Sequence, residues 1–418
     1  MKSAWAALNR NGGRELLADT LTYGIAKGIP GLFGLLSVIV FLRLTGATAY
    51  GRFALISAIV NLWVPFSGGW LSQGILRFGG NWRFNPTAAH RPLRRGLILA
   101  CAVFILAGVV HLGIAENLSA TSAFALSLGV LSIIQATQLA ELQAHLLARR
   151  ILATEMLRSV GCFALAALLA LSMRNGTSAL LFGTALGYAL SVVHIYRIKQ
   201  PTSAAAASPA QVPQLRELWS FGWPLSVWLA GQFAVPLIDR SMMAAQLGLA
   251  ETGKFAALSD ILTRCFSLAI FPITQAVYPR MAQMMDSGQP SAAAALLRRA
   301  SLLLFTLGVI AVPALYLLRN FVVRFSLPAF DPDYSSLVLP LAAGGVIWQA
   351  ALLAHKPLEM AGRTRAMLVA MILTVGLKAG ANCWLLPLWG AQGAAYATLL
   401  AGLCYCLICA GLMRLSRP

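Results

Sequence analysis

Long apolar runs recur along the whole chain, and they constrain its fold more than any other feature of the sequence. The runs at residues 25–42 and 96–115 approach or reach the roughly 20 residues that cross the hydrocarbon core of a bilayer as a helix. Only 11% of the residues are charged, against about 25% in a soluble domain. The sequence therefore predicts an all-α polytopic membrane protein.

About twelve such segments are expected to form transmembrane helices. They lie at residues 21–43, 53–76, 96–115, 121–143, 159–173, 178–196, 219–245, 255–279, 300–318, 336–354, 366–386 and 393–413. The loop after the sixth segment, QPTSAAAASPAQVP (200–213), has the composition of a flexible linker. We therefore expect an N-terminal six-helix bundle (1–199), a cytoplasmic linker (200–216) and a C-terminal six-helix bundle (217–418), a layout common among secondary transporters.

The basic residues predict how the chain lies in the membrane. With both termini placed inside, 22 of the 32 lysines and arginines fall in inner segments, six fall in outer segments and four fall within helices. Basic residues concentrate in cytoplasmic loops. This rule accounts for the net charge of +19 without nucleic acid, and it predicts cytoplasmic termini.

The string GLAETGKF (248–255) has the glycine and lysine spacing of a phosphate-binding P-loop. A P-loop follows a β-strand and has Ser or Thr after the lysine, whereas here Phe255 follows Lys254 and apolar segments flank the string. A second copy, GATAYGRF (46–53), occurs 202 residues earlier. We interpret the two strings as equivalent outer hairpins of a duplicated chain, each with a basic residue that can snorkel at the interface.

Four strings resemble motifs of bacterial polysaccharide (O-antigen, oligosaccharide) flippases, which belong to the multidrug/oligosaccharidyl-lipid/polysaccharide (MOP) exporter superfamily. They are RLTGATAYGRFAL (43–55), LIDRSMMAAQLGLAETGKFAAL (237–258), FPITQAVYPR (271–280) and LWGAQGAAYA (388–397). Together they extend over most of the chain. The resemblance implies the fold of MATE and related MOP transporters.

Ionisable residues within apolar segments are the main candidates for a functional site, because a charge in the hydrocarbon region costs about 2.5–3.5 kcal/mol on insertion scales. Four bases and two acids fall there, which favours an anionic substrate. Trp228 and Gln232 share a helical face with Asp239, and Pro236 is expected to interrupt their helix. The candidate cavity residues are Lys27, Trp228, Gln232, Asp239, Arg240, Asp260, Arg264 and Lys378.

Four of these candidates lead to specific expectations. Lys27 shares a face with Gly24, Gly31 and Gly34, where small side chains leave room for close packing or for a cavity, although the lysine can also snorkel to the inner interface. Asp260 and Arg264 are four residues apart and can form an ion pair that binds substrate or only fixes helix packing. Lys378 has no local acid, which makes it the better candidate for an exposed cavity cation.

The resemblance implies a flippase that moves a polyprenyl-pyrophosphate-linked oligosaccharide across the inner membrane by alternating access, for surface polysaccharide (lipopolysaccharide) biosynthesis. Two alternatives remain. A multidrug or cation antiporter of the same superfamily would be expected to have the opposite interior charge. A polytopic glycosyltransferase or polysaccharide polymerase would need a larger outer loop than residues 319–334.

This interpretation carries further expectations. The protein is expected not to be an enzyme, with no catalytic residues, metal or cofactor, and proton and sodium coupling both stay open. The expected partners are the lipid-linked oligosaccharide and the bilayer, with polysaccharide polymerase machinery as a further candidate and no nucleic acid. The expected location is the bacterial inner membrane.

Overall fold

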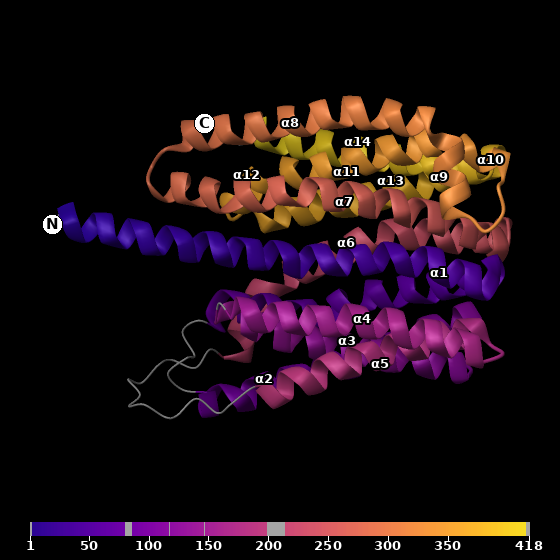
Figure 1. Cartoon of the computed structure of the whole chain (residues 1–418), viewed down its shortest axis with the longest axis horizontal. Coiled ribbons are helices and arrows are strands. Elements are labelled where there is room, and N and C mark those ends of the chain that lie inside the picture. Colours follow the sequence, from indigo (N-terminus) through magenta and orange to yellow (C-terminus); the bar gives the residue numbers. More distant parts are fainter. Residues whose placement is uncertain (1, 80–85, 117, 146, 199–213, 415–418) are drawn as a thin grey trace.

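A computed structural model of the chain describes residues 2–79, 86–116, 118–145, 147–198 and 214–414, and these residues form long helices that lie side by side (Figure 1). The first five helices are α1 (Lys2–Phe78), α2 (Pro86–Glu116), α3 (Ala120–Ala144), α4 (Ala148–Ser172) and α5 (Gly176–Ile198). The next five are α6 (Leu215–Gln246), α7 (Leu249–Asp286), α8 (Pro290–Leu317), α9 (Arg319–Ser326) and α10 (Pro332–Ser335). The last four are α11 (Val338–Ala354), α12 (Lys356–Met360), α13 (Thr364–Trp389) and α14 (Ala391–Arg414).

The described helices confirm the prediction of an all-α multi-pass membrane protein with twelve spans. Ten of them are long and apolar enough to be recognised as spans by length and hydropathy. The first of these holds two of the expected spans, because α1 contains a non-helical residue at Gly46. The other expected span, residues 255–279, lies in α7.

Two further predictions concern the linker and the seventh span. Residues 199–213, which include most of the predicted linker, lie outside the described part of the chain, and the division into bundles of residues 1–199 and 217–418 stays a prediction. Pro236, which was expected to interrupt the seventh span, lies inside the continuous helix α6.

The two copies of the duplicated string turn the chain in the same way. Gly46 has φ 78° and Gly248 has φ 87°, in the left-handed region that glycine enters without steric cost. One turn further on, the copies pack against each other. A Cβ atom on Gly51 would collide with the backbone oxygen of Leu249, and a Cβ atom on Gly253 would collide with that of Ala47.

These reciprocal contacts join equivalent positions, since Ala47 and Leu249 are also 202 residues apart. The duplication read from the sequence is therefore present in space as a symmetric crossing of α1 and α7. Helix α1 makes its most extensive contacts with α6 and α7, so it connects the early part of the chain with the later part.

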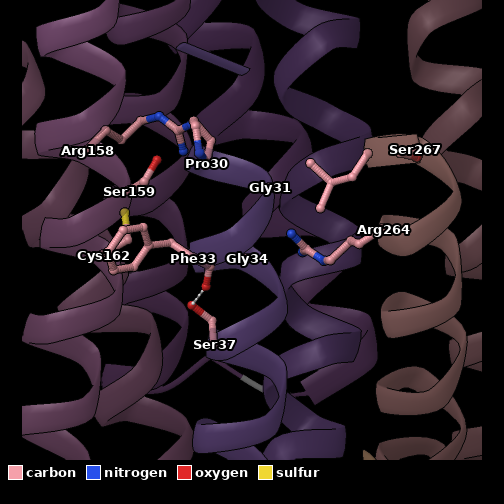
Figure 2. Close-up of a pocket in the computed structure, with 11 residues that line it drawn as sticks. Pro30, Gly31, Phe33, Gly34, Ser37, Arg158, Ser159, Cys162, Arg264 and Ser267 are labelled. Atoms are coloured by element: carbon pink, nitrogen blue, oxygen red, sulfur yellow. Dashed lines mark hydrogen bonds between the residues drawn. The ribbon is translucent and has the colours of Figure 1, made fainter. Parts of the chain in front are cut away.

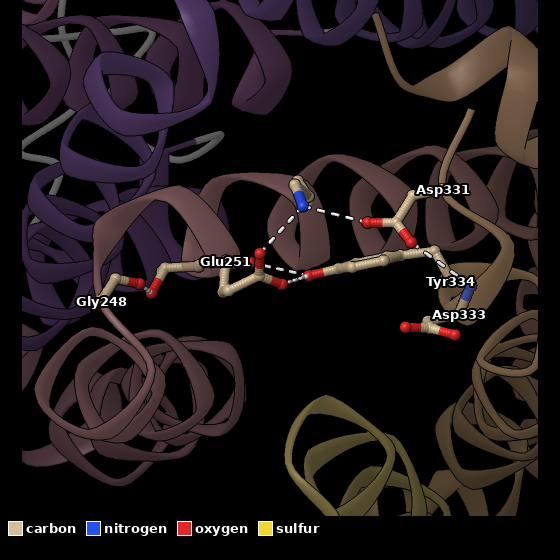
Figure 3. Close-up of polar contacts among 7 residues, drawn as sticks. Gly248, Glu251, Asp331, Asp333 and Tyr334 are labelled. Carbon is tan, nitrogen blue, oxygen red and sulfur yellow. Dashed lines mark hydrogen bonds and ion pairs between the residues drawn. The ribbon is translucent and has the colours of Figure 1, made fainter. Parts of the chain in front are cut away.

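Polar contacts secure the same end of the molecule (Figure 3). Lys254 forms ion pairs with Glu251 at 2.8 Å and with Asp331 at 3.0 Å, and its ammonium lies 5.4 Å from the ring centroid of Tyr334. The Tyr334 hydroxyl donates to Glu251 at 2.6 Å. Lys254 is thus engaged within the protein, where the sequence had suggested a snorkelling side chain.

Candidate substrate cavity

A cavity of about 390 Å³ lies where α1, α4 and α7 meet, so it joins helices from both parts of the duplicated chain (Figure 2). Its walls combine apolar surface with hydroxyl groups and two guanidinium groups. The lining residues are Pro30, Gly31, Phe33, Gly34 and Ser37 from α1, Arg158, Ser159 and Cys162 from α4, and Arg264, Ser267 and Leu268 from α7.

The α1 wall is shaped by the glycine face that the sequence singled out. A Cβ atom on Gly34 would collide with a terminal nitrogen of Arg264, and one on Gly31 would collide with the side chain of Leu268. The missing side chains therefore give α7 side chains room to reach the helix, as expected for small residues at a helix interface. Lys27 lies in α1 one turn before Gly31, but its side chain lies outside the described residues.

Arg264 enters the cavity from α7 and points toward Gly34 (Figure 2). The prediction that Arg264 forms an ion pair with Asp260 is wrong. Asp260 instead pairs with Arg240 of α6, whose Nη2 lies 2.6 Å from Oδ1 while its Nη1 donates to the Ala54 carbonyl at 2.9 Å.

Burial explains why Asp260 pairs with Arg240 and not with Arg264. Arg240 is 9% exposed and needs a counter-charge, whereas Arg264 is less buried and faces the cavity. Among the described residues, Arg264 makes no hydrogen bond or ion pair, so its charge is available to a ligand.

Arg158 supplies the second guanidinium group, and the sequence interpretation missed it. Residues 144–158 were assigned to an inner loop, but α4 begins at Ala148 and carries Arg158 into the cavity wall. Arg158 Nη2 lies 2.8 Å from Oε2 of Glu155, and Gln135 donates to Oε1 of the same carboxylate at 2.9 Å. The sequence did contain an indication of this helix. Glu155 and Arg158 are three residues apart, a spacing that favours a helix, and no proline or glycine separates them from the predicted start of the span at residue 159.

The cavity thus has a positive electrostatic character. Glu155 offsets the charge of Arg158, whereas the charge of Arg264 has no such offset among the described residues. Neither Asp nor Glu is among the lining residues of the described cavity. In a low-dielectric site of this kind, an anion with several oxygens is the ligand that arginine's planar fork binds best.

Lys378 does not line this cavity, and the expectation that it is exposed is wrong. Its side chain is completely buried, and its Nζ lies 2.6 Å from Oδ1 of Asp239. Asn382 donates to the same carboxylate oxygen at 2.7 Å. The acid that the local sequence lacked is supplied by α6, which packs against α13.

The remaining two candidates of α6 also lie away from the cavity walls. Trp228 donates from Nε1 to the Tyr405 hydroxyl at 2.9 Å, and its ring centroid lies 4.8 Å from that of His355. Gln232 is partly exposed and is not a lining residue. Of the eight predicted residues, the structure therefore places Arg264 in the cavity wall, and it does not bring Trp228, Gln232, Asp239, Arg240, Asp260 or Lys378 there.

Comparison with known proteins identifies the fold. No known family model matches the sequence, and no curated protein matches it either. Solved structures do match along nearly the whole chain. A MOP superfamily transporter from Pyrococcus furiosus, reported to have a binding pocket of reverse polarity, has a TM-score of 0.68 at 13% identity, with 95% of this chain and 94% of that chain covered.

Two further neighbours extend the comparison. The eukaryotic MATE transporter AtDTX14 has a TM-score of 0.68 at 13% identity, with 96% of each chain covered. The lipid II flippase MurJ in an inward closed conformation has a TM-score of 0.65 at 15% identity, with 94% of this chain and 87% of that chain covered. The chain therefore has the fold of MOP superfamily transporters, the class to which its sequence motifs are similar.

Proposed function

We propose that this protein is a flippase that moves a polyprenyl-pyrophosphate-linked oligosaccharide from the inner to the outer leaflet of a bacterial inner membrane, for surface polysaccharide biosynthesis. The observation that carries the proposal is the guanidinium group of Arg264, which faces a cavity between the two parts of the chain and has no partner among the described residues. A pyrophosphate group provides the oxygens and the charge that such a group binds.

The mechanism follows from the position of the cavity. Because α1, α4 and α7 all contribute walls, a rocking motion of the two parts of the chain would change the side from which the cavity is reached. Arg264 and Arg158 would hold the pyrophosphate, Lys27 remains a candidate third cation, and the lipid tail would stay in the bilayer. The fold supports a transporter, and the sequence motifs supply the proposed substrate class.

An exporter of organic cations is the main alternative, since MATE transporters share the fold. Such a protein would be expected to offer a carboxylate to its substrate, but the described cavity walls contain none. A glycosyltransferase or polysaccharide polymerase is less well supported, because the matched neighbours named above are transporters and a flippase.

Binding to the purified protein separates these possibilities. We expect farnesyl pyrophosphate to bind in detergent, and Arg264→Ala to weaken that binding at least about tenfold, since hydrogen bonds to charged groups are worth about 1.5–3 kcal/mol. Arg280→Ala, which removes an exposed arginine from the same helix, is the matched control. Tight binding of a lipophilic cation such as tetraphenylphosphonium, unaffected by Arg264→Ala, would favour the antiporter.

A second test examines the position of the guanidinium group. Gly34→Ala places a methyl group where the end of Arg264 lies, so the arginine must move. We expect a loss of pyrophosphate affinity without a change in lipophilic-cation binding. In cells, both variants should reduce surface polysaccharide at unchanged protein levels, and normal polysaccharide in both would contradict the proposal.

A further inference from the structure

The ammonium group of Lys378, on α13, lies inside a cage of oxygen atoms that come from two other helices. It is 2.6 Å from Oδ1 of Asp239 on α6, 2.6 Å from Oγ1 of Thr398 on α14 and 3.2 Å from the carbonyl oxygen of Ala394 on α14. A lysine ammonium has three N–H donors, and each of them has one of these oxygens as its acceptor. The cage closes around a single positive charge.

The cage has the composition of a cation site. Carboxylate, hydroxyl and backbone carbonyl oxygens are the ligands that hard cations prefer. The Thr398 hydroxyl also lies 3.1 Å from Oδ2 of Asp239, which ties α14 to α6. These groups hold their positions through contacts with one another as well as with Lys378.

Asn382 adds a further observation at the same place. It is completely buried, and its Nδ2 donates to Oδ1 of Asp239 at 2.7 Å. Its own Oδ1 is buried and has no hydrogen-bond partner among the described residues, which leaves one more oxygen acceptor beside the cage. Buried oxygen atoms around a structural ion pair normally accept hydrogen bonds. An oxygen without one, like Oδ1 of Asn382, is available as a ligand for a free cation.

We propose that Asp239, Ala394 and Thr398, with Asn382 beside them, form a monovalent-cation site whose cation is the chain's own Lys378 ammonium. The wild-type protein therefore binds no free sodium ion in this cage, and the charge that holds α6, α13 and α14 together is part of the chain. If the protein couples transport to an ion gradient, the coupling ion acts elsewhere. This inference concerns the later part of the chain and does not depend on the identity of the substrate.

Removing the tethered ammonium provides the test. The melting temperature of full-length Lys378→Ala is measured in sodium chloride, in ammonium chloride and in choline chloride at equal ionic strength. We expect sodium or ammonium to raise Tm by about 2 °C or more relative to choline, because a ligand that binds only the folded state stabilises it. The wild type should melt at the same temperature in sodium and in choline.

Two further variants decide the remaining cases. Lys378→Ala combined with Asp239→Asn lacks the carboxylate and should lose the salt effect. Lys378→Gln, which keeps a polar side chain, is used if Lys378→Ala does not fold. A sodium-specific rise in the wild type that Asp239→Asn abolishes would overturn the proposal. It would also fail if neither lysine variant responds to sodium or ammonium, or if neither folds in any of the three salts. None of these measurements uses the transported substrate, so their failure is distinct from a failure of the proposed function.

Discussion

Lys378 and Arg264 are both cations in apolar helices, yet they lie in opposite kinds of environment. Lys378 is completely buried and is held by Asp239 and Thr398. Arg264 lines a cavity and has no partner among the described residues. The first charge stabilises contacts between three helices, whereas the second is available to a ligand. A cation in a membrane span therefore indicates a binding site only when no acidic side chain of the protein already pairs with it.

The more deeply a charged pair is buried, the more stability the protein should lose when one partner is removed. The Lys378 pair should therefore matter most and the unpaired charge of Arg264 least. The relevant measure is the loss of stability when one partner is removed. Breaking a buried pair leaves an uncompensated charge in a low-dielectric interior, whereas removing an exposed partner returns the other to water.

The largest effect is expected for Asp239→Asn. This change leaves Lys378 buried without its counter-charge, at a cost of about 3–5 kcal/mol. The measurement is the melting temperature in detergent, or the yield of monodisperse protein if the variant does not fold. Asp333→Asn, an exposed change of the same type, should have little effect.

A double variant sharpens this result. Asp239→Asn combined with Lys378→Met removes both charges, and it should recover much of the lost stability because apolar side chains can replace a buried pair. If the double variant is as unstable as Asp239→Asn alone, the loss has another origin than the unpaired ammonium.

An intermediate effect is expected at the pair of Arg240 and Asp260, whose side chains are 10% and 26% exposed. Asp260→Asn should cost about 1–3 kcal/mol, since Arg240 keeps its hydrogen bond to the Ala54 carbonyl. A double-mutant cycle between positions 240 and 260 should show a coupling of at least about 0.5 kcal/mol.

The same cycle between positions 260 and 264 is the control, and it should be additive within about 0.5 kcal/mol. The opposite pattern would restore the pairing of Asp260 with Arg264 that the sequence suggested. It would also remove the main argument that the Arg264 charge is free to bind a ligand.

The sequence predicted much of the fold because the fold depends on local patterns. Apolar runs of sufficient length define the spans, and the repeated strings at Gly46 and Gly248 mark two equivalent turns whose positive φ angles only glycine adopts easily. The duplication also predicted two related parts of the chain, and the crossing of Gly51 and Gly253 agrees with it.

The site was harder to predict because it depends on contacts between distant segments. The sequence places Asp239 and Lys378 far apart, so no spacing rule could pair them, and the nearby Asp260 looked like the natural partner of Arg264. Arg158 was missed for a local reason. Its helix begins at Ala148 in a stretch that carries several charges, and hydropathy alone assigns such a stretch to a loop.

A smaller effect is expected at Lys254, whose side chain and carboxylate partners are all partly exposed. Lys254→Ala should reduce stability by no more than about 1 kcal/mol, because water can solvate Glu251 and Asp331 after the change. High salt should reduce the difference between the variant and the wild type, since screening weakens exposed pairs. A loss as large as that of Asp239→Asn would show that this end of the molecule is not accessible to water.

The smallest effect on stability is expected for Arg264→Ala, although it should have the largest effect on ligand binding. Arg264 has no partner among the described residues, so its removal leaves no buried group unsatisfied. The free energy of unfolding, followed through Tm, should therefore change by no more than about 0.5 kcal/mol. Arg280→Ala should be equally neutral for stability but should leave farnesyl pyrophosphate binding intact. If Arg264→Ala instead lost as much stability as Asp260→Asn, Arg264 would be a structural residue like Lys378, and the two cations would no longer differ in role.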